Sequence, residues 1–293
     1  MKIKIKNIID NLNLILVLGK VRITSFVAIS TALGYVLASG TIDYGLILPV
    51  LGVFLLACGS SAFNQFQEYI PDSLMKRTMH RPIPSSKLTP MQGFLIASIL
   101  SVNGIISLLL SGNMLLVYLG VFTLMWYNLV YTPLKKKTSL AVVPGALIGA
   151  IPPAIGWVAG GGELINPQVW ILSLFFFIWQ IPHFWLLLLI YEEDYRRAGF
   201  PSLTDRFSRQ TMTRITYMWI AALAASCMLI PLFGLSDNII SNIILFIAGC
   251  WLMWRTKNLL IQFEQKNIFR FAFMNVNLYV LAVAVVLSIE KLL

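Results

Sequence analysis

The sequence predicts an all-α integral membrane protein that crosses the bilayer nine times. Its composition, the recurrence of apolar segments and the one-sided distribution of its cations support this prediction. Of the 293 residues, 58% are hydrophobic and 12% are charged, with a mean hydropathy of +0.80. A soluble domain typically has about 25% charged residues. Because the chain has too few charges to surround one core with a polar surface, a soluble enzyme, a disordered chain and a disulfide scaffold are excluded.

The apolar segments are long enough to cross a membrane, which requires about 20 mostly apolar residues. They are apolar around their full circumference, unlike the surface helices of a soluble fold. We expect one nine-helix domain over 23–293, preceded by an interfacial segment, 1–22, that lacks the small-residue cleavage site of a signal peptide. The predicted spans are 23–41, 45–63, 94–111, 114–130, 140–160, 168–190, 213–234, 239–254 and 271–289, the division of 213–254 being the least distinct.

The basic residues predict the orientation of the chain. Of the 22 Lys and Arg residues, all but Lys291 and Arg214, the second residue of the seventh predicted span, lie before the first predicted span or in the connections that follow the even-numbered spans. The positive-inside rule therefore places the N-terminus and these connections in the cytoplasm and the C-terminus on the opposite side. A miscounted helix would disturb this alternation, so the charges independently support nine spans. Membrane orientation accounts for the net charge of +10, and we expect no nucleic-acid partner.

A first acidic cluster follows the second predicted span. Asn64, Glu68 and Asp72 are four residues apart, so a helix would place them on one face, although Pro71 is expected to bend that helix near its end. Oxygen ligands grouped in this way suit Mg²⁺, which typically binds a few carboxylates together with substrate phosphates. The alternative is a solvated helix end with incidental acids, and the spacing alone does not decide between the two.

A second acidic cluster, Glu192, Glu193 and Asp194, follows the sixth predicted span. Beside Arg196 and Arg197 it is also compatible with ordinary surface charge. If both clusters faced one cytoplasmic cavity, however, they would hold two metal ions around a diphosphate. Basic residues predicted on the same membrane face would assist: Lys76, Arg77, Arg81 and Lys135 to Lys137.

Four segments resemble the UbiA-type intramembrane prenyltransferases and, more narrowly, their heme O synthase branch. The first Asp-rich motif of that family is similar to NQFQEYIPDSLMKRTMHRPIP at 64–84. Three further matches follow in order, namely YTPLKKKT at 131–138, GALIGAIPPAIGW at 145–157 and WQIPHFWLLLLIYEEDYRRAGFPSL at 179–203. The chain departs from the family at Ile70, where relatives often have an additional Asp, and at Glu193, which replaces the first Asp of the second motif. Lys136 and Lys137 stand where Arg is usual.

The resemblance implies a helical bundle with a central cavity open to the cytoplasm, in the inner membrane of a bacterium. It implies transfer of a farnesyl group from farnesyl diphosphate to a vinyl group of heme b, with addition of water, to make heme O on the way to heme A. Partners downstream would be a heme A synthase or oxidase assembly factors. The implied catalytic residues are Asn64, Glu68, Asp72 and Asp194. The implied Mg²⁺ ligands are these four and Glu193, and the implied diphosphate ligands are Lys76, Arg77, Arg81 and Lys135.

His183 is the candidate heme contact or axial ligand, because an ionisable group inside a membrane span is by default a functional candidate. The alternative is a hydrogen-bonded structural histidine. His80, in the cationic loop, is a secondary candidate. Three other functions remain possible: a prenyltransferase acting on a quinone-ring precursor or a chlorophyllide-like acceptor, an ion-relaying transporter, and a heme-handling protein without catalysis. The acids lie mostly at span ends, which disfavours the transporter.

Overall fold

The computed structural model describes residues 12–293, so part of the predicted interfacial segment 1–22 lies outside the described residues. Within the described range the chain is helical and contains nine segments long and apolar enough to cross a membrane, which confirms the predicted number of spans. The helices of the first half are α2 (Val21–Ser39), α3 (Ile47–Gln67), α4 (Tyr69–Leu74), α5 (Pro90–Leu110), α6 (Met114–Met125), α7 (Thr132–Lys135) and α8 (Val142–Ala159). Those of the second half are α9 (Pro167–Ile190), α10 (Glu192–Arg197), α11 (Arg209–Ser226), α12 (Leu229–Leu232), α13 (Ile239–Thr256) and α14 (Lys266–Leu292).

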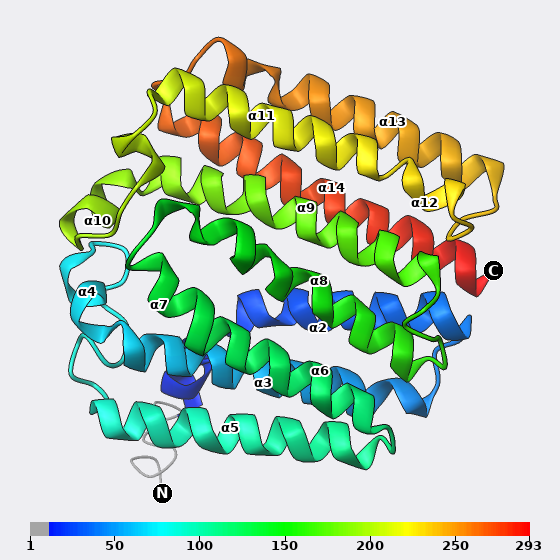
Figure 1. Ribbon diagram of the computed structural model, residues 1–293, viewed down its shortest axis with the longest axis horizontal. Coiled ribbons are helices and arrows are strands. Elements are labelled where there is room, and N and C mark those ends of the chain that lie inside the picture. The colour runs from blue at the N-terminus through cyan, green and yellow to red at the C-terminus, as the bar shows by residue number, and fades with distance from the viewer. Residues whose placement is uncertain (1–11) are drawn as a thin grey trace, which may run out of the picture.

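The long helices run side by side in one bundle (Figure 1). The most extensive contacts join α3 to α5, α2 to α8 and α8 to α9, and α9 also packs against α11 and α14. Helices α2 and α8 approach so closely that a β-carbon at Gly34 or Gly156 would collide with the backbone of the other helix, at Pro153 and Thr31 respectively. Small residues at such crossings let helix backbones make close van der Waals contact in a membrane, where no hydrophobic effect drives helices together.

The outer faces of the bundle are apolar. Helix α13, for example, exposes Ile240, Ile243, Ile247 and Trp254, whereas α8 in the middle of the bundle is largely buried. Exposed side chains of this kind suit contact with lipid chains rather than with water.

The uncertain division of 213–254 is resolved into two spans, Arg209–Leu232 and Ile239–Leu260. Most observed spans begin earlier than predicted or end later, because polar residues at their ends also adopt helical structure. The third span begins at Pro90, four residues before the predicted start, because Thr89 and Gln92 form a capping box and Pro90 occupies the first helical position.

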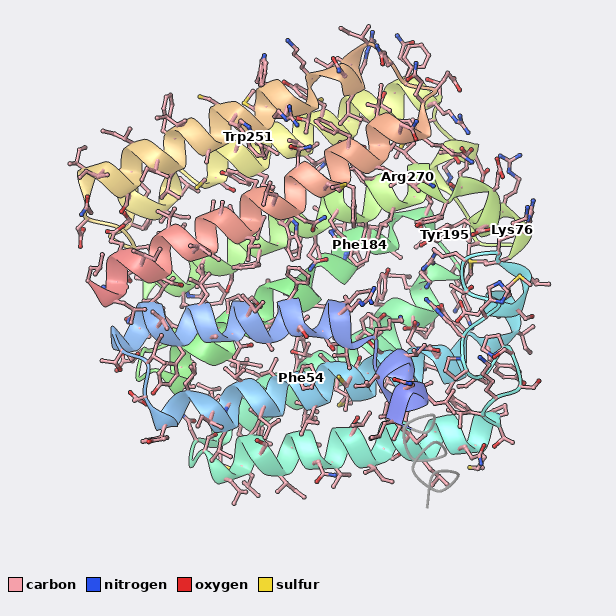
Figure 2. The ribbon with its side chains drawn as sticks, turned by 180° about the vertical axis from the view of Figure 1, so that it is seen from behind. Phe54, Lys76, Phe184, Tyr195, Trp251 and Arg270 are labelled. Atoms are coloured by element: carbon pink, nitrogen blue, oxygen red, sulfur yellow. The ribbon has the colours of Figure 1, made fainter. Side chains whose placement is uncertain are left out.

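Three short helices, α4, α7 and α10, gather at one end of the bundle (Figure 1). We call this end the acidic–basic end, because it carries both acidic clusters and the basic residues beside them. Figure 2 shows Lys76, after α4, close to Tyr195 of α10 at this end. The fold therefore brings the two acidic clusters to the same end of the bundle, although more than a hundred residues separate them in the chain.

Candidate active site

The first acidic cluster lies where one helix ends and another begins. Helix α3 ends at Gln67, and Glu68 leaves helical geometry, with φ −118° and ψ 14°, before α4 starts at Tyr69. Pro71 explains the position of the break, because proline has no N–H to donate to the carbonyl four residues earlier and its ring collides with that carbonyl. The carbonyl concerned, of Gln67, instead accepts a hydrogen bond from Lys136 Nζ at 3.1 Å. The bend near Pro71 thus lies at the end of α3, as expected, and Asp72 belongs to the next helix, α4.

Despite the break, Asn64, Glu68 and Asp72 are all buried, with exposed fractions of 3%, 2% and 1%. Asn64 Nδ2 donates to Glu68 Oε2 at 3.0 Å. A backbone hydrogen bond connects Glu68 to Asp72, because the Asp72 N–H donates to the Glu68 carbonyl at 2.8 Å. The predicted grouping of Asn64 with Glu68 is therefore observed, and Asp72 follows one helical turn later.

Each buried carboxylate has a cationic partner. Lys135 Nζ lies 2.8 Å from Glu68 Oε2, and Arg81 Nη1 lies 2.6 Å from Asp72 Oδ2. Removing one partner of a buried ion pair typically costs about 3–5 kcal/mol, because an uncompensated charge remains. Lys135 also makes a cation–π contact, because its Nζ lies 5.1 Å from the ring centre of Phe200. Two of the predicted phosphate-binding side chains, Arg81 and Lys135, therefore lie directly against the predicted metal ligands.

The donor set fits a metal ion that is shared with a diphosphate. Oε1 of Glu68 is buried and has no hydrogen-bond partner within residues 12–293, so one carboxylate oxygen is left for a ligand. In the same part of the chain, no three Asp, Glu, His or Cys side chains are arranged to hold an ion by themselves. Mg²⁺ commonly binds through one or two carboxylates, with water and substrate phosphates completing its octahedral shell. These residues match that partial set better than a cage made only of protein ligands.

Asp194 connects the second acidic cluster to the loop that follows the first. Its carboxylate oxygens accept hydrogen bonds from the backbone N–H groups of Lys76 and Arg77, at 3.1 and 3.2 Å. The side chains of Lys76 and Arg77 are exposed, and the guanidinium of Arg77 lies 5.0 Å from the ring centre of Tyr191. Asp194 therefore holds the loop that follows α4 against α10.

The two glutamates beside Asp194 point elsewhere. Glu192 is paired with Arg209 at 2.6 Å and with Arg196 at 3.4 Å. Glu193 is exposed and lies 3.2 Å from Lys266, whose hydrogen bond holds the pKa of this carboxyl below its ordinary value. The structure thus does not bring Glu193, which the sequence suggested as a metal ligand, to the Glu68–Asp72 cluster. His80 is likewise exposed in its loop.

Lys20 is a site residue that sequence reasoning missed. It precedes α2 with a left-handed backbone, φ 50° and ψ 47°, and its Nζ lies 3.4 Å from Asn64 Oδ1. Burial, and then the charges of Arg81 and Lys135, lower its pKa to about 7. In the sequence Lys20 resembles any other cation that satisfies the positive-inside rule. No pattern in the neighbouring sequence distinguishes it.

A π-helix, Trp126–Tyr131, is the second missed feature. It joins α6 to α7 and ends beside Thr132, whose hydroxyl accepts a hydrogen bond from Asn64 Nδ2 at 3.3 Å. Within the π-helix, Asn128 exchanges hydrogen bonds with Ser60 of α3 at 2.8 and 3.0 Å. Insertions of this kind are rare and often occur at functional sites. Here the π-helix connects the segment that carries Lys135 to the segment that carries the first acidic cluster.

His183 lies apart from the acidic clusters, inside α9. Its Nδ1 is 2.9 Å from Oδ1 of Asn277 in α14, and the rings of Trp179, Phe184 and Phe273 surround it. Figure 2 shows Phe184 inside the bundle, farther from the acidic–basic end than Tyr195. The candidate residues therefore fall into two groups, a charged group at one end of the bundle and an aromatic group deeper among the spans.

The chain belongs to the UbiA prenyltransferase family, whose signature matches residues 27–278. It is thus a multi-pass membrane enzyme of the prenyltransferase class. Among curated relatives, the protoheme IX farnesyltransferase of Geobacter sulfurreducens is 40% identical over 220 residues, which cover 75% of this chain and 81% of the relative. The protoheme IX farnesyltransferase of Oleidesulfovibrio alaskensis is 34% identical over 232 residues, which cover 79% and 82% of the two chains.

Solved structures confirm the fold. A digeranylgeranylglyceryl phosphate synthase superimposes with a TM-score of 0.76 at 17% identity, covering 97% of this chain and 99% of its own. A UbiA homologue from Aeropyrum pernix gives a TM-score of 0.71 at 16% identity, with coverage of 92% and 97%. A UbiA homologue from Archaeoglobus fulgidus, solved with GPP and Mg²⁺, gives 0.66 at 12% identity, with coverage of 94% and 99%.

Replacing Lys20 by Met removes an amine that a bound, anionic diphosphate would keep protonated, while retaining most of the side-chain volume. We expect the affinity for a prenyl diphosphate in the presence of Mg²⁺ to fall roughly tenfold or more, since charge-assisted hydrogen bonds to phosphate are about twice as strong as neutral ones. Lys87, an exposed lysine of the loop after α4, provides the control K87M. Equal affinity of K20M and K87M, measured by calorimetric titration, would show that Lys20 does not bind the diphosphate.

Proposed function

We propose that this protein transfers the farnesyl group of farnesyl diphosphate to a vinyl group of heme b, with addition of water, and so makes heme O. The observation that carries the proposal is the buried acid–cation cluster of Glu68, Asp72, Arg81 and Lys135, with one carboxylate oxygen left unpaired. Membership of the family indicates prenyl transfer as the reaction class. The protoheme IX farnesyltransferases among the relatives indicate a farnesyl donor and a heme acceptor.

The charged end of the bundle is proposed to bind the diphosphate together with Mg²⁺. Asn64, Glu68 and Asp72, and separately Asp194, would bind Mg²⁺ together with the diphosphate, because no three acids of the described residues converge on one ion. The metal would supply positive charge to the diphosphate as the C–O bond breaks. Arg81, Lys135 and Lys20 would then exchange their carboxylate and amide contacts for phosphate oxygens. The side chains of Lys76 and Arg77 are exposed at the acidic–basic end, where they would meet the diphosphate as it enters.

In the proposed mechanism these residues favour departure of the diphosphate. The bond between the farnesyl C1 and the diphosphate oxygen breaks, its electron pair leaves with the diphosphate, and an allylic cation remains. Cations fixed beforehand around the leaving group stabilise the negative charge that develops on it, with little reorganisation during the reaction. The π electrons of the heme vinyl group then form the new C–C bond. Water adds to the resulting cation next to the porphyrin and loses a proton.

The apolar spans would keep water away from the allylic cation until the vinyl group has reacted. His183 is proposed to contact the heme, because it is the histidine within a span and lies among aromatic rings. It precedes the end of α9 by roughly 10 Å at 1.5 Å per residue. A porphyrin held at His183 would therefore lie roughly two helical turns from the end of α9 that precedes α10.

Product formation tests the proposal. Membranes that contain the protein, supplied with heme b, farnesyl diphosphate and Mg²⁺, should yield heme O, detected by mass spectrometry. D72N and D194N should lower the rate roughly 100-fold or more, because each removes a charge from the diphosphate site, while heme binding persists. The control E264Q neutralises an exposed acid at the same end that pairs with Arg209, and it should retain activity. Prenylation of a quinone precursor without any heme product would overturn the proposal in favour of another acceptor.

The proposed location is the inner membrane of a bacterium, with the N-terminus and the acidic–basic end facing the cytoplasm and the C-terminus facing the other side. The product would pass to a heme A synthase or to oxidase assembly factors. A cysteine-free chain carrying K87C, at the acidic–basic end, or Y44C, an exposed residue in another connection, reports the orientation. In right-side-out vesicles, an impermeant maleimide should label Y44C and leave K87C unlabelled. The reverse pattern would contradict the orientation.

A further inference from the structure

His183 and Asn277 form a polar contact between two spans. His183 belongs to α9 and Asn277 to α14, helices that pack against each other, and Nδ1 of the imidazole lies 2.9 Å from Oδ1 of the amide. Polar side chains inside a membrane bundle are costly and generally mark functional sites. This contact lies outside the charged cluster that binds diphosphate in the proposed function.

The surroundings of Asn277 determine which imidazole nitrogen carries the proton. Asn277 Nδ2 donates to the backbone carbonyl of Phe273 at 2.6 Å. That carbonyl only accepts, so the amide nitrogen must face it and the amide oxygen must face His183. An amide oxygen also only accepts, so Nδ1 of His183 must be the donor. In the neutral imidazole, the unprotonated nitrogen is therefore Nε2.

Nε2 is left available for a ligand. Among the described residues, no group forms a hydrogen bond with it, and His183 is partly exposed although Ile181 and Pro182 before it are buried. The imidazole is held by rings on three sides, with centroid distances of 4.7 Å to Phe273, 5.2 Å to Trp179 and 5.5 Å to Phe184. Flat aromatic side chains of this kind suit a large planar ligand.

A second polar group beside His183 also lacks a partner. The indole Nε1 of Trp179, one helical turn before His183, is buried without an acceptor in the structure of residues 12–293. A buried donor without a partner is uncommon in folded proteins and requires an explanation. A ligand with a polar edge that bound at the imidazole would provide the missing acceptor.

We propose that Asn277 is a positioning residue that keeps the proton of His183 on Nδ1, so that Nε2 binds the iron of the porphyrin substrate. The inference rests on the proposed function, because the acceptor there is an iron porphyrin. Histidines that ligate metals usually donate their second N–H to a carbonyl or carboxylate, which fixes the ring and raises its basicity. The amide oxygen of Asn277 performs that role here.

The test is a titration of the full-length protein in nanodiscs with ferric heme b, without farnesyl diphosphate. The readouts are the dissociation constant and, after reduction, the iron–histidine stretching frequency. The variants are H183A, N277L and N277D. The matched control is N275L, because Asn275 lies on the same helix and likewise donates to the carbonyl four residues earlier, at 2.6 Å, but its oxygen faces Arg255.

We expect N277L to weaken heme binding by roughly 10- to 100-fold, the usual effect of losing such a partner, and to lower the stretching frequency. N277D should retain binding and raise the frequency, since a carboxylate accepts the Nδ1 proton more strongly. N275L should match the wild type in both readouts. Because N277D retains a hydrogen-bond acceptor, it tests the inference even where N277L does not fold.

Two results would overturn the inference in distinguishable ways. If H183A abolishes the iron–histidine band while N277L and N277D match the wild type, then His183 binds heme without help from Asn277. If H183A leaves the band unchanged, then His183 is not the ligand. In that case heme O formation by the wild type, measured in parallel, shows whether the proposed function itself survives.

Discussion

Buried carboxylates at one end of an apolar bundle need compensating charge, and this requirement organises the site. Glu68 and Asp72 are almost inaccessible to solvent, and they lie where α3 gives way to α4. An isolated ionised carboxylate in such surroundings would cost several kcal/mol. Lys135 and Arg81 provide the compensation, each from a separate segment of the chain. The same cations are then in place for a diphosphate, so the resting ion pairs and the proposed catalytic contacts use one set of side chains.

Several irregularities of the fold follow from this arrangement. The interruption at Glu68 turns α4 away from the axis of α3, and the freed carbonyl of Gln67 is used to anchor Lys136. The π-helix before Lys135 ties that segment to α3 through Asn128. Asp194 holds the loop after α4 through two backbone N–H groups. Each of these features joins segments that are distant in the chain, and together they assemble the charged end.

The number of spans and the first acidic cluster were predictable from the sequence because both depend on local rules. A span needs a minimum apolar length, and the spacing of Asn64 and Glu68 matches one helical turn. The contact of Lys20 with Asn64 was not predictable, because Lys20 lies before a span like the other cations that only orient the chain in the membrane. Nor was the contact of His183 with Asn277, which joins residues 94 positions apart. The separation of Glu193 from Asp194 depends on which face of α10 meets the loop after α4, and neighbouring acids in a sequence carry no such information.

The acidic–basic end is proposed to bind a metal ion and a diphosphate as one unit, because no three acidic, His or Cys side chains of the described structure converge to hold an ion alone. The thermal stability of the purified protein, measured with Mg²⁺, with farnesyl thiodiphosphate, and with both, tests this proposal. Binding as one unit should give little change with Mg²⁺ alone and a stabilisation with both that exceeds the sum of the separate effects, about 2.7 kcal/mol at a ligand concentration 100 times Kd. Equal stabilisation by Mg²⁺ alone, or no response to the pair, would contradict it.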